Sequence, residues 1–346
     1  MFPSPVDSDR SQPRTAITRR QAFTWDLERP TLDSDFWIRV HRQAMACRFE
    51  VLLSAEDARY VAAAGAALDL VERLEAQLTV FRSTSEVVHL NQRAACGATP
   101  ASPELLALLR QCREVHEKTS GAFDVTSTPL SRCWGFLRRE GRLPSDAEIA
   151  AARAVVGMQH VDFDDELRTV HFRRDGVELN FGSIGKGFAL DRMAGLLRRC
   201  GVERALLSAG RSSVLAIGGD EGGFLVDVVS PQALSGRLTR LRLRDAALGT
   251  SGAGVQFMEI DGKRYGHVLD PRTGWPASGV LSASVVASGA ATADALSTAF
   301  LVGGLPLARE FCAKNSGVLA LVTLDDGSER PCVMGSHPGA ALVEQA

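Results

Sequence analysis

The sequence predicts an α+β fold with mixed, mostly antiparallel sheets and packed helices. Short segments with strand character follow one another through turns, and helical segments are interspersed among them. Asp261-Gly262 separates two such strands, and this dipeptide favours the two-residue turn of a β-hairpin. Hairpins mixed with helices indicate an α+β fold rather than a doubly wound sheet. Because the chain shows no internal repeat and no linker after residue 40, we expect a single integrated domain, over residues 39–340.

Composition argues against two classes of protein. The 346 residues carry 39 Lys and Arg against 41 Asp and Glu, a formal net charge of −2. Such a balance argues against nucleic-acid binding by bulk electrostatics and against a polybasic membrane-surface protein. Hydrophobic residues make up 45% and charged residues 23%, which is typical of a globular chain.

Residues 1–38 are rich in Pro, Ser, Asp and Arg without periodicity, so we expect a flexible tail. Arg19-Arg20 is similar to a twin-arginine export signal, but charged residues follow it instead of an apolar core. No run approaches the roughly 20 apolar residues of a membrane span. The seven cysteines are scattered, without a C-x-x-C pair, which favours a reducing compartment over disulfides or zinc. We therefore expect a cytoplasmic protein.

The first elements follow from periodicity and capping. Cys47–Leu53 alternates loosely and is expected to form a strand. From Glu56 to Leu78 apolar residues recur at helical spacing and predict a long amphipathic helix. Ser102 can cap a helix and Pro103 suits its first position, so a second helix should run to about residue 120, where a glycine follows.

The rest of the chain alternates between strands and helices. Further helices are expected after Ser145, from the glycine-rich turn at 182–187 to about residue 200, over Thr292–Gly303 and over Pro306–Ser316. Two or three strands should lie between Val161 and Leu179. The remaining expected strands are Arg204–Ser208, Val214–Ile217, Gly223–Val229, Arg237–Leu243, Phe257–Ile260, Lys263–Val268, Leu281–Ala287 and Val318–Thr323.

Residues 180–187, N-F-G-S-I-G-K-G, form a glycine-rich turn entering a helix. Unpaired backbone N–H groups and the positive end of the helix dipole suit a phosphate there. The segment is not a P-loop, because Asn180 and Gly187 stand where that motif needs Gly and Ser or Thr, and it is not a Rossmann G-x-G-x-x-G. The alternative is an ordinary tight turn between a strand and a helix.

Asp294 and Thr298 lie four residues apart, so their oxygens fall on one helix face. A carboxylate and a hydroxyl are a plausible partial ligand set for Mg²⁺. The alternative is that Asp294 favours the helix dipole and Thr298 bonds back to the helix. His267 ends a strand before an Asp-Pro-x-x-Gly turn, as a candidate general base or a half-buried strand histidine.

Ala122-Phe123-Asp124 follows a helix, with Trp134 downstream. Aromatic side chains beside an acid could line a cleft for a planar ring, or could belong to the core.

In their joint order, these segments resemble the ApbE family of FAD:protein FMN transferases. The segments are A-F-D-x-T-x-x-P-L-x-x-x-W-G-F, N-F-G-S-I-G-K-G-F-A-L-D, H-V-L-D-P-R-T-G-W-P and T-A-D-A-L-S-T-A-F. The resemblance extends from about Met45 to Thr323 and includes the earlier stretch Phe81-x4-Glu86…Leu90-Asn91.

The resemblance implies an ApbE-like (T-fold-like) flavin transferase domain that cleaves the pyrophosphate of FAD with Mg²⁺. FMN would pass to a Ser or Thr hydroxyl of an acceptor protein bearing an S-G-A-T-like segment, and AMP would leave. The implied metal ligands are Ser183, Gly185, Asp294 and Thr298. The implied FAD contacts are Met45, Phe81, Ala122, Phe123, Asp124, Asn180, Lys186 and His267. As catalytic residues the resemblance implies Asp294 and His267, the latter deprotonating the acceptor hydroxyl.

The chain departs from the family pattern in two places. Asn180 stands where an Asp is usual, which keeps an acceptor and loses a charge. The usual Asn-x-Gly-Gly-Asp reads Ser208-Ala209-Gly210-Arg211-Ser212, so that Arg211 brings a positive charge near the expected phosphates. Arg211 could hold the pyrophosphate or fill the space that the ring needs. Three hypotheses follow: an active transferase, an FAD-binding protein that has lost transfer, and an FAD pyrophosphatase giving FMN and AMP.

Overall fold

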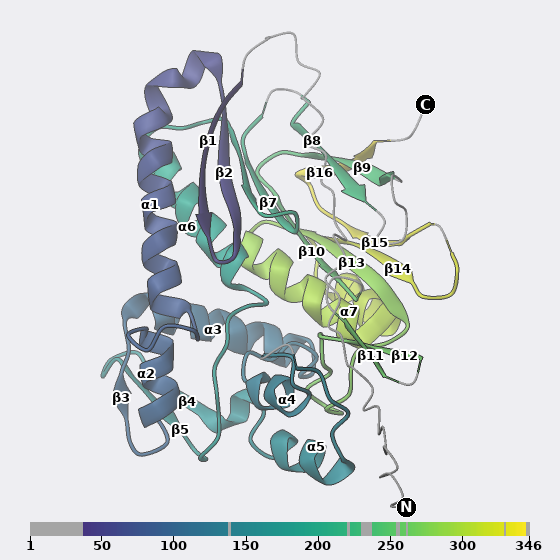
Figure 1. Ribbon diagram of the computed structural model, residues 1–346. Coiled ribbons are helices and arrows are strands. Elements are labelled where there is room, and N and C mark those ends of the chain that lie inside the picture. Colours follow the sequence, from purple (N-terminus) through teal and green to yellow (C-terminus); the bar gives the residue numbers. More distant parts are fainter. Residues whose placement is uncertain are drawn as a thin grey trace, which may run out of the picture.

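A central antiparallel sheet of eight strands organises the protein (Figure 1). The computed structural model describes residues 37–137, 140–219, 222–229, 237–253, 257–260, 262–328 and 330–343. In spatial order the strands are β1 (Trp37–Ala44), β2 (Cys47–Ser54), β6 (Ala205–Ala209), β7 (Ser213–Ile217), β10 (Ala247–Gly252), β13 (Val280–Ala287), β14 (Val318–Leu324) and β15 (Cys332–Ser336). Each neighbouring pair is antiparallel, as the hairpin pattern predicts.

Both faces of this sheet are covered. On β14, Val318, Ala320 and Val322 pack toward the helices, whereas Leu319 and Leu321 pack in a second apolar cluster with strands of a smaller sheet. This is the two-residue period of a strand, with apolar residues at both phases because neither face meets water. The smaller sheet has the order β16 (Ala340–Val343), β9 (Arg237–Leu243) and β8 (Phe224–Val229).

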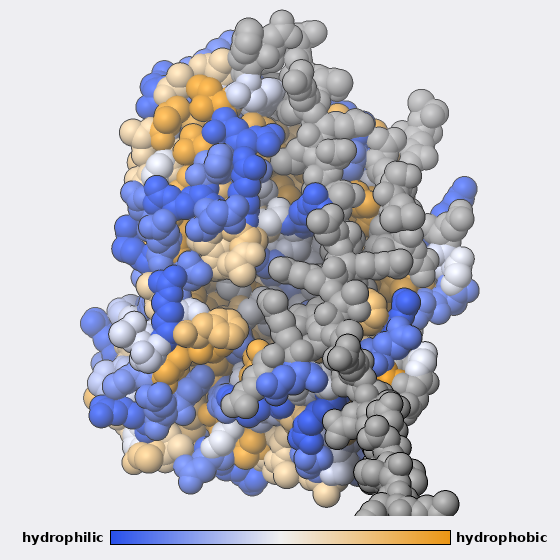
Figure 2. Space-filling model, viewed as in Figure 1, coloured by the Kyte–Doolittle hydropathy of each residue, from blue (hydrophilic) through white to orange (hydrophobic). Residues whose placement is uncertain are grey.

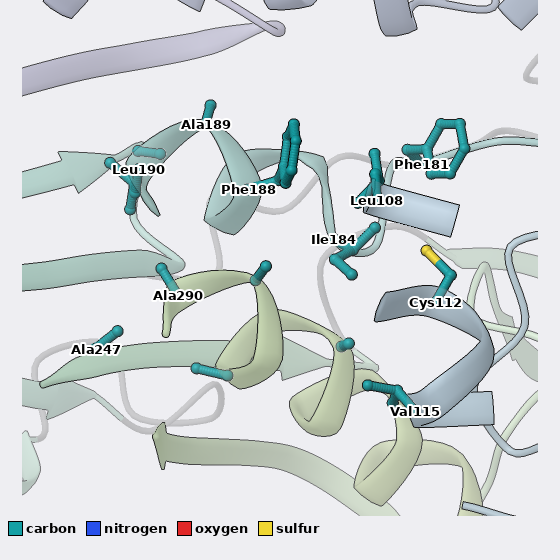
Figure 3. Close-up of a cluster of buried hydrophobic side chains, with 14 of the residues drawn as sticks. Leu108, Cys112, Val115, Phe181, Ile184, Phe188, Ala189, Leu190, Ala247 and Ala290 are labelled. Atoms are coloured by element: carbon teal, nitrogen blue, oxygen red, sulfur yellow. The ribbon is translucent and has the colours of Figure 1, made fainter. Parts of the chain in front are cut away.

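Four helices make up most of the other layer (Figure 1). They are α1 (Val61–Leu78), α3 (Pro103–Lys118), α6 (Gly185–Arg199) and α7 (Ala290–Lys314). Figure 3 shows Ile184 and Phe188, at the start of α6, beside Leu108 of α3, in the apolar cluster that these helices share. The packing fixes the N-terminal ends of α6 and α7 next to each other.

Smaller elements complete the helical side of the molecule. The short helices are α2 (Glu86–Arg93), α4 (Thr128–Cys133) and α5 (Asp146–Arg153), with 3₁₀ segments at Ala55–Tyr60 and Met158–His160. The remaining strands are β3 (Thr99–Pro100), β4 (Val161–Asp164), β5 (Thr169–Phe172), β11 (Phe257–Ile260) and β12 (Lys263–Gly266).

The structure confirms the capping predictions. Ser102 accepts a hydrogen bond of 3.2 Å from the backbone N–H of Leu105, and Ser145 forms a reciprocal capping box with Glu148. The two helices expected after residue 290 are the two parts of α7, which is interrupted at Gly304 (φ +70°). The expected hairpin is β11–β12; of its turn, Asp261 lies outside the described residues.

The domain limits differ slightly from the prediction. Strand β1 begins at Trp37, so the last two residues of the predicted tail, 37 and 38, belong to the sheet, while residues 1–36 lie outside the described part of the chain. At the other end, β16 continues to Val343, three residues past the predicted limit.

Helix α7 is, among the described helices, the one long and apolar enough by length and composition to cross a membrane. Of its most apolar stretch, 61% is buried inside the protein, as in the core helix of a globular domain. Over the coloured part of the face in Figure 2, hydrophilic residues are interspersed with small apolar patches.

Candidate active site

One cleft of about 920 Å³ collects nearly all the site residues that the sequence predicts. Its lining comes from segments far apart in the chain, and two of them are the adjacent N-terminal ends of α6 and α7. The predicted residues in the lining are Met45, Phe81, Ala122, Asp124, Asn180, Ser183, Gly185, Lys186, His267, Asp294 and Thr298. Phe123 is placed differently, because it is 1% exposed and packs in the core behind this wall.

Asp294 joins the two helix ends. Its Oδ2 accepts a hydrogen bond of 2.7 Å from the backbone N–H of Gly187, and its Oδ1 accepts one of 2.7 Å from the Ser213 hydroxyl. A Cβ on Gly187 would lie 2.1 Å from the carbonyl oxygen of Ala290, so only glycine allows this approach. The glycine-rich turn therefore brings α6 against α7, beyond turning the chain.

Asp191 caps α7 from outside that helix. Its two carboxylate oxygens accept hydrogen bonds from the backbone N–H groups of Ala290 (2.7 Å) and Ala291 (2.9 Å). The helix's own N-cap residue, Gly289, has no side chain to do this. Asp191 is the last residue of the motif N-F-G-S-I-G-K-G-F-A-L-D, but its role is not predictable from the sequence, because a cap supplied by a different helix leaves no local signal.

A cluster of hydroxyl groups lies beside Asp294. The Ser251 hydroxyl is 2.8 Å from that of Ser297 and 3.0 Å from that of Thr298. Ser297 and Thr298 also donate to the carbonyl oxygen of Asp294, at 2.8 and 3.3 Å, which is the back-bonding considered as the alternative for Thr298. Both Ser251 and Ser297 line the cleft; Ser297 belongs to the motif T-A-D-A-L-S-T-A-F but had no predicted role, and Ser251 was not predicted.

The electrostatics around Asp294 are those of a buried acid beside a cation. Burial raises the pKa of the Asp294 carboxyl to about 6, against the lowering effects of the Lys186 ammonium and of the hydrogen bonds from Ser213 and Gly187. The Lys186 ammonium donates to the Ser212 hydroxyl. Removing Asp294 would leave the Gly187 N–H and the Ser213 hydroxyl without this acceptor, and Lys186 without the nearby carboxylate charge.

The donor set fits a magnesium ion. Carboxylate and hydroxyl oxygens are hard ligands, and Mg²⁺ commonly takes only one or two carboxylates from a protein and keeps water or phosphate oxygens. Within the described ranges no group of three or more His, Cys, Asp or Glu side chains could hold a metal ion. A site here would accordingly be built around Asp294, Thr298 and neighbouring oxygens.

Asn180 shapes the turn before α6. Its Oδ1 accepts a hydrogen bond of 2.9 Å from the Gly182 N–H, so the amide forms the local turn that a carboxylate could form equally well. Asn91 holds the preceding residue: its amide donates to the Leu179 carbonyl (3.0 Å) and accepts from the Leu179 N–H (2.8 Å). The side chain of Asn91 thus makes the two backbone hydrogen bonds that a neighbouring strand would otherwise make with Leu179.

Asp124 is buried among polar partners. Its Oδ1 accepts from the N–H and the hydroxyl of Thr126, at 2.8 and 2.6 Å, and its Oδ2 lies 3.2 Å from Nδ1 of His116. Burial lowers the pKa of His116, but the hydrogen bond and charge of Asp124 outweigh this and raise it overall. Asp124 therefore favours the charged form of His116 beside the cleft wall.

Met45 and Phe81 lie on the open side of the cleft. Met45 and Ala46 form the two-residue turn between β1 and β2 with φ of +47° and +57°, a conformation that costs non-glycine residues free energy. Phe81 follows α1 and is 81% exposed. A large exposed aromatic side chain at the mouth of a cleft suits stacking against a planar ligand.

His267 follows β12 and enters the lining just before a tight turn. The predicted Asp-Pro turn is confirmed: the Asp270 carbonyl accepts from the N–H of Gly274 at 2.7 Å, and its Oδ1 accepts from the N–H of Arg272 at 2.9 Å. The indole N–H of Trp134 donates to the Gly274 carbonyl at 2.8 Å. These contacts anchor the segment that carries His267.

Comparison with known proteins agrees with this arrangement. The model of the ApbE family matches residues 45–322. An FAD:protein FMN transferase of Klebsiella pneumoniae is 32% identical over 66% of this chain and 71% of its own, and one of Vibrio cholerae is 29% identical over 75% and 78%. The crystal structure of the ApbE protein of Thermotoga maritima superposes with a TM-score of 0.77 at 30% identity, covering 87% of this chain and 97% of that one. The apo flavinyl transferase ApbE of Pseudomonas stutzeri gives 0.75 at 27% identity, covering 88% and 95%.

The fold and the cleft are those of a flavin-transferring enzyme. The matched range contains every cleft residue discussed above, and the fold covers nearly the whole length of the related structures. The chain belongs to the ApbE family of flavin transferases.

Proposed function

We propose that this enzyme transfers the FMN part of FAD to a Ser or Thr hydroxyl of an acceptor protein, in a Mg²⁺-dependent reaction that releases AMP. The supporting observation is the meeting of Lys186, His267, Asp294 and Thr298 in one cleft. Relatives over about three quarters of the chain are named FAD:protein FMN transferases, which supports FAD as the donor and a protein as the acceptor.

The metal end of the site would be formed by Asp294 and Thr298, helped by oxygens of the Ser183–Gly185 turn. When bound there, Mg²⁺ would supply charge neutralisation for the pyrophosphate and its leaving group. The buried carboxylate of Asp294 is already fixed by Gly187 and Ser213, so its position needs no reorganisation.

The FAD molecule would lie along the remaining lining. Lys186, held by Ser212, would pair with a phosphate oxygen. Phe81 offers a ring face at the mouth, and Met45, Ala122, Asp124 and Asn180 complete the wall.

His267 would act on the acceptor. Its imidazole would accept the proton of the acceptor hydroxyl, whose oxygen attacks the phosphorus atom of the FMN half. A new P–O bond forms as the bond from that phosphorus to the bridging oxygen breaks, and AMP leaves with the bridging oxygen. General base catalysis of this kind contributes about 10²–10⁴-fold to a rate.

The acceptor would be another protein with an S-G-A-T-like segment. We also propose that the enzyme works in the cytoplasm, on an acceptor or a loop exposed there, because its seven scattered cysteines favour a reducing compartment. Asn180 and Arg211 motivate the second candidate, an FAD-binding protein without transfer activity.

The test is an incubation of the purified protein with FAD, Mg²⁺ and an acceptor domain that bears an S-G-A-T-like segment. Flavin fluorescence on the denatured acceptor, with AMP formed in equal amount, supports the transferase. AMP and free FMN without a labelled acceptor indicate a pyrophosphatase. Tight FAD binding without AMP release would favour the binding protein. The matched control is Asp294→Asn, which should form neither product.

A further inference from the structure

The turn between β6 and β7 presents a single unpaired cationic side chain to the cleft. The backbone of this turn is fixed on both sides: the Gly210 N–H donates to the Arg48 carbonyl (2.8 Å), and the Ser212 carbonyl accepts from the Thr250 N–H (2.8 Å). Gly210 has a φ of +60°, and a Cβ there would lie 3.1 Å from Cβ of Cys47. Arg211 is therefore held at a defined place at the cleft wall.

The Arg211 side chain makes no ion pair and no hydrogen bond with any residue in the described ranges. Arg48, on the adjacent strand β2, contrasts with it, because the Arg48 guanidinium lies 2.7 Å from the carboxylate of Glu50. Arg211 is exposed yet faces a concave, ligand-sized space, where a guanidinium without a carboxylate is available to an anion.

A second cation lies in the same part of the cleft. The Lys186 ammonium donates to the hydroxyl of Ser212, the residue next to Arg211. The following residue, Ser213, donates to Asp294. The order along this wall is thus an arginine, a serine-bound lysine and the carboxylate of Asp294.

We propose that Arg211 binds the pyrophosphate of the dinucleotide substrate and makes this enzyme selective for diphosphate-bearing flavins. A guanidinium presents parallel N–H donors that match two oxygens of a phosphate group, whereas Lys186 acts as a point charge. Together they oppose the two negative charges of the pyrophosphate. This inference rests on the proposed function, because it takes FAD as the ligand of the cleft.

The experiment measures dissociation constants for three ligands at one ionic strength: FAD, ADP (a pyrophosphate without flavin) and riboflavin (a flavin without phosphate). The variants are Arg211→Gln and Arg211→Lys, with Arg48→Gln as the matched control. Arg48 is on the same sheet, is bound to Glu50 and is absent from the lining; Glu50 would keep Arg39 at 3.8 Å.

Arg211→Gln should raise the dissociation constants of FAD and ADP about tenfold or more, as expected for loss of a charge-assisted hydrogen-bonded pair. The dissociation constant of riboflavin should change less than about twofold, because riboflavin carries no phosphate for the guanidinium to bind. Arg211→Lys should fall between wild type and Arg211→Gln, and Arg48→Gln should match wild type for all three ligands.

Three results would overturn the inference: unchanged FAD and ADP binding in Arg211→Gln, equal weakening of all three ligands, or tighter riboflavin and FAD binding. The last would mean that Arg211 fills the space of the ring. The proposed function fails separately, if the wild-type protein binds ADP but neither FAD nor riboflavin.

Discussion

The backbone N–H of Gly187 donates a hydrogen bond of 2.7 Å to Oδ2 of Asp294, across the junction of α6 and α7. One residue of the glycine-rich turn therefore holds the expected metal ligand, and it does so with an atom that every residue except proline has. What makes position 187 special is space, since the Ala290 carbonyl of α7 lies where a side chain would begin.

Gly187→Ala should destabilise the protein by about 1–3 kcal/mol, the usual cost of overpacking a dense interior. The free energy of urea unfolding measures this. Gly195→Ala is the matched control, because it lies in the same helix with its nearest neighbour, an Arg199 side-chain atom, at 3.5 Å. That control should stabilise the protein by about 0.5–1 kcal/mol. Equal effects of the two substitutions would contradict the close approach of α6 and α7.

Asp191→Ala should lower stability by about 0.5–2 kcal/mol, because α7 loses the acceptor for its first N–H groups. Since α7 carries Asp294 and Thr298, FAD-dependent AMP release should fall as well. Ser145→Ala removes the cap of α5, which lies away from the cleft, and should cost similar stability without changing AMP release. A loss of AMP release in both variants would mean that reduced stability alone explains the effect.

His267→Gln should slow FMN transfer by about 10²–10⁴-fold if His267 is the general base. The dissociation constant of FAD should change little, so the effect belongs to the rate of a single turnover rather than to binding. His89→Gln, an exposed histidine on α2 outside the cleft lining, serves as the control. A variant that transfers FMN at the wild-type rate would remove His267 from the mechanism.

The raised pKa of Asp294 predicts that the stability of the metal-free protein depends on pH. Its folded-state pKa of about 6 lies above the ordinary 3.8, so between these values the folded state binds more protons than the unfolded state. Stability contributed by this group therefore falls as the pH rises through that window. An asparagine at position 294 does not titrate. The difference in unfolding free energy between wild type and Asp294→Asn should therefore change between pH 3.8 and about 6. Urea titrations in EDTA at several pH values measure that difference; a constant value would show that burial does not control this carboxyl.

His116 is a base with a raised pKa, and its contribution to stability also falls as the pH rises. Its pairing with Asp124 stabilises the folded protein fully below the ordinary pKa of 6.5, and this contribution is lost as the pH rises through the raised value. His116→Gln should abolish that part of the pH dependence. A histidine whose NMR titration midpoint lies at or below 6.5 would contradict the pairing.

The sequence predicts elements best where their signals are local. The helix of Ser102 and Pro103 and the strand predicted at Val318–Thr323 are found, as α3 and β14, because capping residues and a short run of apolar residues act over a few positions. Strand β10 escaped prediction since A-L-G-T-S-G has little strand propensity. Its Gly249 is required instead by α7, whose backbone lies 2.5 Å from where a Cβ would be. Packing against α7, and not local propensity, therefore determines that these residues form a strand.

The site was predicted in the same uneven way. Asp294, Lys186 and Met45 follow from motifs in a known order, and they line one cleft. Asp191 and Ser251 were missed, because each acts across to another element and neither is part of a periodic pattern. The resemblance carried the prediction further than the residues alone would have.

The pairing of β2 with β6 governs when the cleft can exist during synthesis. Glu50 on β2 pairs with Ser208 on β6, 158 residues later in the chain. The cleft wall also needs Asp294 and Thr298, which are synthesised later still. A nascent chain that has released β1, β2 and α1 from the ribosome consequently exposes their apolar faces until most of the protein has been translated. The complete cleft therefore forms only after the chain has been synthesised beyond Thr298, so ligand binding cannot assist the folding of the first strands.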